Sequence, residues 1–138
     1  MFAVKPLEDK SVQHQLCALL NTEYIADSLA YFAADLEDDG SAIKGIIGIL
    51  QFKMTEETGE ILTLIPAAGK EDDEAMFIME RACMSFMWRS GMKRMIMKDT
   101  AGPDNVLSRS GLPKVNGEYT VDLDVFFASP CHYNKNNK

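Results

Sequence analysis

The amino-acid sequence predicts a single mixed α/β domain, and three observations support this class. The length of 138 residues is that of one ordinary domain and is short for two. Hydrophobic residues make up 46% of the chain and charged residues 25%, which is typical of globular proteins and excludes a disordered or fibrous chain. Short apolar runs that end in turn residues alternate with longer runs of helical spacing, as in domains that pack helices on a sheet.

The chain is predicted to open with a strand and a helix. Residues 2–7 (FAVKPL) are a short apolar run that contains a proline, which suits a first strand. Ser11 is a good helix N-cap, and apolar residues follow it at helical spacing at Val12, Leu16 and Leu19. We therefore predict that the first helix begins at Ser11.

The segment 22–36 is compatible with two structures. It keeps a helical stripe of apolar residues at Ile25, Leu29, Phe32 and Leu36, but residues 31–36 would suit a strand equally well. We predict a helix followed by a strand. An acidic turn at 37–40 and a β-branched apolar run at 42–52 come next, and together they complete a hairpin.

A second turn is predicted at 56–59, and it leads into a strand at 60–66 (EILTLIP). From 71 to 90 the pattern changes to that of a long helix stopped by Gly91. The broad apolar face of this helix holds Met76, Met79, Cys83, Phe86 and Met87. We interpret this methionine-rich face as core; the alternative is a flexible binding surface.

Three shorter elements complete the domain: a strand at 93–98, a helix at 102–110 closed by Gly111, and a strand at 119–127. In that last strand Asp122 and Asp124 would share one face, where they would either line a cleft or be solvated. The domain is predicted to span residues 1–132, and the polar residues 133–138 are expected to form a disordered tail.

The formal net charge of −7 argues against nucleic acid and anionic membrane surfaces as partners. No apolar run approaches the length that crosses a bilayer, so we expect a cytoplasmic protein that does not enter membranes. Three widely spaced cysteines fit a reducing compartment and resemble no metal site. Two histidines, neither in a recognisable motif, offer little to a histidine-based triad, so no metal is expected.

Three stretches resemble the GNAT superfamily of N-acetyltransferases. The hairpin DLEDDGSAIKGIIGILQF is similar to that family's second and third strands. The strand EILTLIP resembles its cofactor-binding strand. The long helix resembles the helix that follows that strand in the family, and SGMKRMIM resembles the next strand. VLSRSGL is similar to the end of its fourth helix. The resemblance implies a central mixed, mostly antiparallel sheet flanked by about four helices.

The resemblance also implies where a cofactor would bind. Acetyl-CoA would dock along the strand residues Leu62, Thr63, Leu64 and Ile65, with its pyrophosphate on a Q/R-x-x-G-x-G/A loop at the next helix N-terminus. That loop falls at 71–76, which has no glycine and begins with four carboxylates. Only Gly69 and Lys70 could stand in. Because like charges repel, tight binding of CoA in the usual mode is not expected. Acidic residues in a first helical turn also have a structural role, since they stabilise the helix dipole.

The catalytic groups that the resemblance implies are incomplete. Many family members have a tyrosine four residues before the closing glycine, where it returns a proton to the thiolate. That position is Leu107 here, which has no proton to give. The family's general base is commonly a Glu early in the fourth strand, and Glu60 is the candidate.

Two main hypotheses follow from the sequence. The first is a GNAT-fold binding or regulatory domain that has lost acetyl transfer, needs no cofactor, binds an unidentified small molecule and forms a homodimer. The second is an atypical N-acyltransferase that uses acetyl-CoA, with Glu60 as base and a cationic amine as acceptor. A weaker third possibility is a protein-interaction module that uses Trp88, Phe126 and Phe127.

Overall fold

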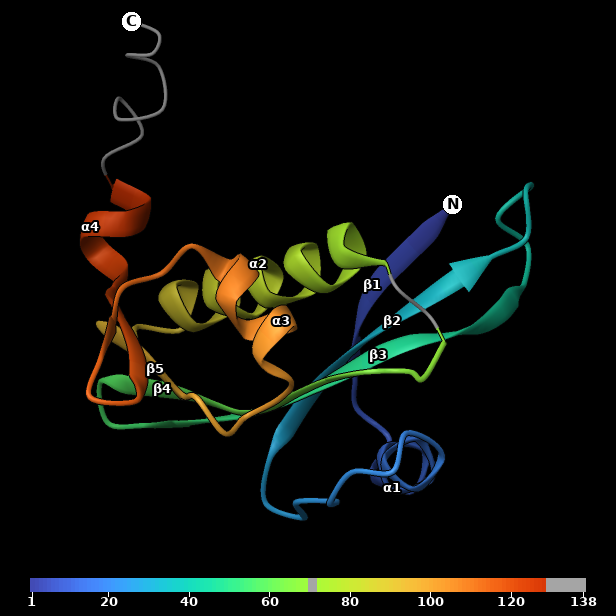
Figure 1. Cartoon of the computed structure of the whole chain (residues 1–138), viewed down its shortest axis with the longest axis horizontal. Coiled ribbons are helices and arrows are strands. Elements are labelled where there is room, and N and C mark those ends of the chain that lie inside the picture. Colours follow the sequence, from blue (N-terminus) through green and yellow to red (C-terminus); the bar gives the residue numbers. More distant parts are fainter. Residues whose placement is uncertain (70–71, 129–138) are drawn as a thin grey trace, which may run out of the picture.

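The structure, a computed structural model, describes residues 1–69 and 72–128. A seven-stranded sheet in the order β1-β2-β3-β4-β5-β7-β6 forms its centre (Figure 1). All neighbouring strands are antiparallel except β4 and β5, which are parallel. The strands are β1 (Phe2–Leu7), β2 (Leu29–Leu36), β3 (Ile43–Thr55), β4 (Thr58–Pro66), β5 (Arg94–Lys98), β6 (Lys114–Val115) and β7 (Glu118–Asp122).

Four α-helices flank the sheet within the described residues, so the expected mixed, mostly antiparallel sheet with about four helices is confirmed. Helix α1 lies on one face, and α2 and α3 lie on the other (Figure 1). None of the helices in the described ranges has both the length and the apolar character that crossing a membrane requires. The helices are α1 (Lys10–Leu19), α2 (Asp73–Arg89), α3 (Asp104–Leu107) and α4 (Leu123–Ala128), with a 3₁₀ turn, η1 (Ser108–Ser110), after α3.

The core lies between α2 and the sheet. The apolar face predicted for the long helix is confirmed as core, because Met76, Met79, Cys83 and Met87 are at most 4% exposed. Met95 and Met97 of β5 are fully buried in the same cluster. Methionine side chains adapt to irregular gaps. This suits a core beside β4 and β5, because these two strands pair over only part of their length.

Two predictions at the N-terminal end are wrong. The first helix is capped by Asp9 and not by Ser11: the Asp9 carboxylate accepts hydrogen bonds from the main-chain N–H groups of Ser11 and Val12. Residues 22–28 form an irregular segment with a turn at 26–27 and not a helix. The reason is tertiary, because the side chain of Gln51 bonds the main chain at Glu23 and Ile25 and so replaces the bonds of a helix.

The prediction for the last element is wrong in its second half. Strand β7 ends at Asp122, and α4 follows. The Asp122 carboxylate accepts a hydrogen bond from the N–H of Val125, as a helix cap does. Asp124 accepts one from the Trp88 indole and lies 3.4 Å from the Lys93 ammonium. The two aspartates therefore have separate roles and do not share a strand face. The predicted tail, 133–138, lies outside the described residues.

A buried polar network joins α1 to the sheet on the face opposite α2. Gln51 of β3, which is fully buried, accepts a hydrogen bond from Gln13 of α1 at 2.8 Å and donates one to the Thr63 hydroxyl of β4 at 3.1 Å. The same amide bonds the main chain at Glu23 and Ile25. Every polar atom of the Gln51 side chain has a partner, so the network fixes α1 and the 22–28 segment on the sheet.

Replacing Gln51 by leucine is expected to lower the free energy of unfolding by about 2–5 kcal/mol, because several buried polar groups lose their partner at once. Urea denaturation would measure the change. The matched control is Gln15→Leu at an exposed position of α1, which should change the stability by less than about 0.5 kcal/mol. Equal stabilities for the two variants would contradict the role given to Gln51.

Candidate functional site

The candidate site is the place where β4 and β5 separate. The two strands pair in register from Thr58 with Arg94 to Ile61 with Met97, and the ladder ends there. On its other side β4 carries a bulge: Ile61 pairs with Phe52 and Thr63 with Gln51, which leaves Leu62 unpaired. A bulge bends its strand and raises the local twist. The second half of β4 therefore turns away from β5, and its main chain needs another partner.

The chain itself supplies that partner. The N–H of Leu64 donates a hydrogen bond of 2.9 Å to the carbonyl oxygen of Ala101, in the loop after β5. Gly102 follows so closely that a Cβ there would lie 2.1 Å from the Leu64 carbonyl oxygen, so no larger residue fits without movement of the loop. At Leu64 the edge of β4 is thus paired with the protein's own main chain.

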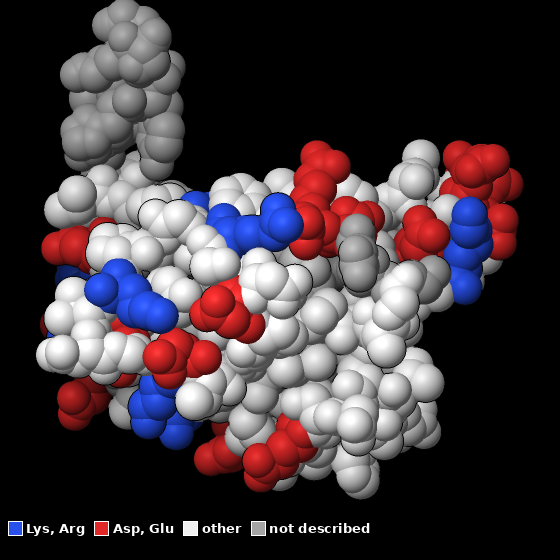
Figure 2. Space-filling model, in the orientation of Figure 1, with Lys and Arg blue, Asp and Glu red and all other residues white. Residues whose placement is uncertain are grey.

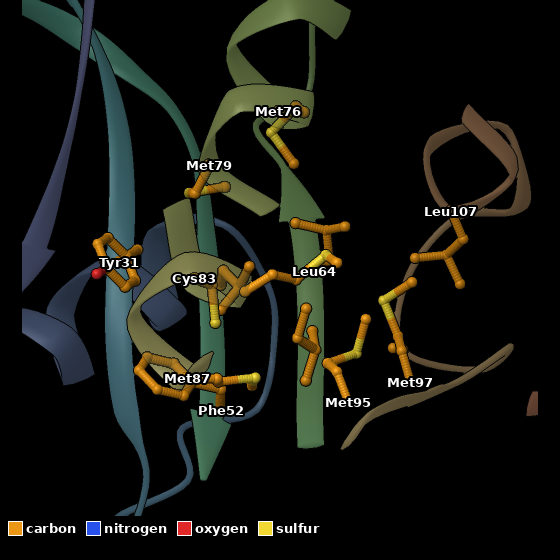
Figure 3. Close-up of a cluster of buried hydrophobic side chains, with 14 of the residues drawn as sticks. Tyr31, Phe52, Leu64, Met76, Met79, Cys83, Met87, Met95, Met97 and Leu107 are labelled. Atoms are coloured by element: carbon orange, nitrogen blue, oxygen red, sulfur yellow. The ribbon is translucent and has the colours of Figure 1, made fainter. Parts of the chain in front are cut away.

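Apolar side chains fill the space between the separated strands. Leu64 of β4, Met97 of β5 and Leu107 of α3 point toward one another (Figure 3). Leu107 and Met97 are fully buried, and Leu64 is 2% exposed. The position at which the resemblance implies a proton-donating tyrosine is therefore a packed core leucine.

Carboxylates take up the N-terminal end of α2. The Asp72 carboxylate caps the helix by accepting a hydrogen bond of 3.0 Å from the N–H of Ala75. Asp73 forms an ion pair of 3.2 Å with Arg109 of η1. Figure 2 shows acidic side chains gathered over this end of the helix, and a second acidic group at the tip of the β2–β3 hairpin. Gly69 has φ +77° and open space around it, whereas Lys70 and Glu71 lie outside the described residues.

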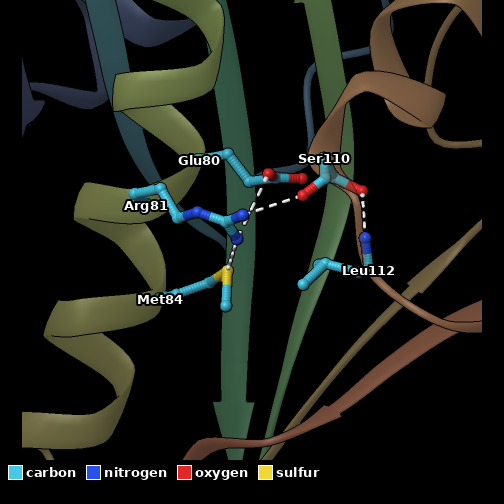
Figure 4. A network of polar contacts seen from close by, with 5 residues as sticks. All are labelled: Glu80, Arg81, Met84, Ser110 and Leu112. Atoms are coloured by element: carbon cyan, nitrogen blue, oxygen red, sulfur yellow. Dashed lines mark hydrogen bonds and ion pairs between the residues drawn. The ribbon is translucent and has the colours of Figure 1, made fainter. Parts of the chain in front are cut away.

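A cavity of about 10 Å³ remains between β4, α2 and the α3–η1 segment, which is the volume of about one water molecule. Leu64 and Met76 line it together with Asp73, Phe77, Glu80, Val106, Arg109 and Ser110. Two polar contacts hold its walls together: the Asp73–Arg109 ion pair, and a hydrogen bond of 2.8 Å from Arg81 to the carbonyl oxygen of Ser110 (Figure 4).

Glu80 is the unusual ionisable group of this cavity. Its side chain is buried, its Oε1 lies 4.0 Å from the Arg81 guanidinium, and its Oε2 has no hydrogen-bond partner among the described residues. Burial raises the pKa of Glu80 from its usual 4.5 to about 7, and the positive charge of Arg81 opposes this rise. The neighbouring Cys83 thiol has a pKa well above its usual value, because of burial first and the Glu80 charge second.

Sequence reasoning missed Glu80, although a signal was present. Glu80 lies four residues after Met76 and three before Cys83, so it falls within the apolar stripe of α2. A carboxylate in the middle of a core-facing stripe is rare unless it is paired or neutral.

The candidate general base, Glu60, lies on a different face of the sheet. A Cβ at the adjacent Gly59 would contact Met87 of α2, and successive residues of a strand point to opposite faces. Glu60, half-buried, therefore points away from α2 and from the cavity around Glu80. Thr63, one of the proposed cofactor residues, already accepts a hydrogen bond from Gln51. In the described part of the chain no cluster of His, Cys, Asp or Glu could hold a metal ion.

Comparison with solved structures shows that the chain has the GNAT fold. A Desulfovibrio desulfuricans protein described as an acetyltransferase of the GNAT family matches with a TM-score of 0.62 and 11% identity, over 89% of this chain and 99% of that one. The dodecameric spermidine N-acetyltransferase from Vibrio cholerae matches with 0.61 and 9%, over 91% and 96%. A chain of the NatC complex bound to Gag peptide and CoA matches with 0.54 and 15%, over 70% and 73%.

No protein-family model and no curated protein matches the sequence. At identities of 9 to 15% this structural likeness shows the fold alone, so the activity has to be argued from the residues of this chain.

The raised pKa of Glu80 predicts a pH-dependent stability. Between pH 4.5 and 7 the unfolded state releases this proton while the folded state keeps it, so stability falls as pH rises through that window and levels off above it. The total loss is on the order of 3 kcal/mol.

Glu80→Gln should remove this dependence and be more stable than the parent protein at pH 8, with little difference at pH 4.5. Urea denaturation at several pH values would measure it. The exposed Glu74→Gln on the same helix is the control and should keep the slope. A parent protein with no slope between pH 4.5 and 7 would contradict the assignment.

Proposed function

We propose that this protein is a GNAT-fold binding or regulatory domain that does not transfer acetyl groups. The observation that carries the proposal is the hydrogen bond between Leu64 and Ala101. In an acyltransferase of this fold the cofactor would take the main chain of Leu62–Ile65. Here the 101–102 loop covers part of that edge, and CoA would have to displace the loop before it could bind.

Electrostatics support the same conclusion. A pyrophosphate at the N-terminus of α2 would meet Asp72 and Asp73, and Asp72 already satisfies one of the N–H groups that an anion would use. At an effective dielectric near 20, one like-charge pair at about 4 Å costs on the order of 4 kcal/mol, and less where solvent screens it. Leu107 adds a chemical reason, since it cannot protonate a departing thiolate.

The proposal predicts that about 1 mM acetyl-CoA leaves the melting temperature unchanged. A ligand present at 100 times its Kd would stabilise the protein by about 2.7 kcal/mol, which is a rise on the order of 5–10 °C for a domain of this size. Differential scanning fluorimetry would measure it, with a GNAT enzyme of known CoA affinity as the positive control.

A dose-dependent rise in melting temperature would overturn this function and favour the atypical N-acyltransferase. In that case Leu62, Thr63, Leu64, Ile65, Gly69 and Lys70 would hold the cofactor, Glu60 would act as base, and a cationic amine would accept the acyl group. Thiol release with spermidine or lysine that disappears in Glu60→Gln would establish that alternative.

We also propose that the domain forms a homodimer. Strand β1 lies at one end of the sheet and, among the described residues, pairs with β2 alone, so its other edge is available to a further strand. The Vibrio cholerae relative is itself an oligomer, a dodecamer. Light scattering after size exclusion should give twice the chain mass of 15.4 kDa at about 100 µM. A mass of one chain at that concentration would contradict the dimer.

A further inference from the structure

A second concavity, far larger than the cavity at Glu80, lies on the α2 face near the other end of the sheet. Its volume is about 510 Å³, within the usual range for small-molecule sites. It is bounded by the last turns of α2, the end of β1, the start of α1 and the start of β2, and it shares none of its described lining residues with the Glu80 cavity. We refer to it as the β1–α2 pocket. Its lining residues include Lys10, Tyr31, Phe52, Phe86 and Arg89.

Three aromatic rings form one wall of the β1–α2 pocket. The ring centres of Tyr31, Phe52 and Phe86 lie 5.8 to 6.4 Å apart, and the rings come from three different elements. Phe52 is 2% exposed and Tyr31 is 7% exposed, so packing holds both rings in place. Phe86 is the most accessible of the three rings, so it would supply the contact surface for an apolar or aromatic ligand, and the two buried rings hold it in place.

The Tyr31 hydroxyl adds a polar group to this wall. Figure 3 shows its oxygen on the side of the ring that faces away from the buried methionines. The hydroxyl has no hydrogen-bond partner among residues 1–69 and 72–128, and it keeps contact with solvent, since it is not among the buried atoms without a partner. Burial raises the pKa of Tyr31, so the group is a neutral hydrogen-bond donor at physiological pH.

The charges at the β1–α2 pocket are opposite in sign to those of the whole protein. The chain carries −7, yet two cations, Lys10 and Arg89, line the pocket with one acid, the exposed Glu8. Arg89 forms no ion pair with the described part of the chain. Its Nε donates a hydrogen bond of 3.3 Å to the Ser85 hydroxyl and its guanidinium carbon lies 6.0 Å from the centre of the Phe86 ring, but neither terminal nitrogen has a hydrogen-bond partner among the described residues. The two terminal nitrogens of the guanidinium are free to bind a carboxylate through paired hydrogen bonds.

We propose that the β1–α2 pocket binds a small aromatic carboxylate, with its ring against Phe86 at the edge of the aromatic wall and its carboxylate on Arg89. The Lys10 ammonium, which donates hydrogen bonds to the Ser28 carbonyl oxygen and to Oε1 of Gln13, adds positive potential, and the Tyr31 hydroxyl is a further donor. A cationic ligand would meet two like charges, and a neutral ligand would leave the Arg89 guanidinium without a counter-charge. The inference rests on the proposed function, since it names the ligand class of a binding domain.

The test uses the full chain and three probes that share one ring and one linker: phenylacetate, its neutral amide phenylacetamide and the cation phenethylamine. Isothermal calorimetry and chemical-shift titration should show phenylacetate binding with a Kd of about 1 mM or tighter, and the amide at least about tenfold weaker. Phenethylamine should not bind. Equal affinity for the acid and the amide would overturn the role of charge, and no binding of phenylacetate at about 10 mM would overturn the site.

Arg89→Gln should weaken phenylacetate binding about tenfold and leave phenylacetamide unchanged. Arg94→Gln, an exposed arginine on β5 outside this pocket, is the matched control and should bind as the parent does. Equal losses in both variants would show general charge attraction and overturn the site. The acetyl-CoA titration is a separate experiment. Binding of acetyl-CoA without binding of phenylacetate would contradict both proposals, whereas binding of acetyl-CoA together with phenylacetate would contradict the proposed function alone.

Discussion

The separation of β4 from β5 at the Leu62 bulge is the constraint on which the rest of this structure depends. A parallel pair that parts in the middle of a sheet leaves main-chain donors and acceptors that must find partners, because a buried N–H without one costs about as much as a lost hydrogen bond. A ligand can supply those partners, or the chain can. In this protein the carbonyl oxygen of Ala101 supplies one of them, to Leu64.

Beside this hydrogen bond, the side chains between β4 and β5 belong to the core. Leu107, Met97 and Leu64 fill the space, and the 101–102 loop is held so close to β4 that only glycine fits at 102. This packing also encloses Glu80, whose Oε2 has no hydrogen-bond partner in the described part of the chain. Burial raises the free energy of an ionised carboxylate in that position. The neutral form is therefore favoured, and the pKa of Glu80 rises.

The fold was predictable from the sequence where local pattern and tertiary packing agree. The structure has a strand at each of the apolar runs 42–52, 60–66 and 93–98, and a helix at the methionine stripe of α2. Their apolar residues are buried against one another, as the pattern predicts. The prediction fails at 22–28, where a side chain 26 residues away bonds Ile25, and at 123–127, where Asp122 caps a helix. Of the site, Leu107 and the acidic start of α2 were visible in the sequence. The Leu64–Ala101 bond was not, because it joins two main-chain atoms that carry no sequence signature.

The distribution of charge shows why a strongly acidic chain can still offer an anion site. The net charge governs the potential at long range, but beyond about 10 Å salt screens it, and the groups within a pocket decide which ligand is held. At the N-terminus of α2 the described part of the chain places Asp72 and Asp73, and Arg109 beside them is already paired with Asp73. At the β1–α2 pocket Arg89 has no paired acid among the described residues and sits beside fixed aromatic rings. The two concavities therefore differ in the property that selects an anion, namely a cation whose charge the fold has not already neutralised.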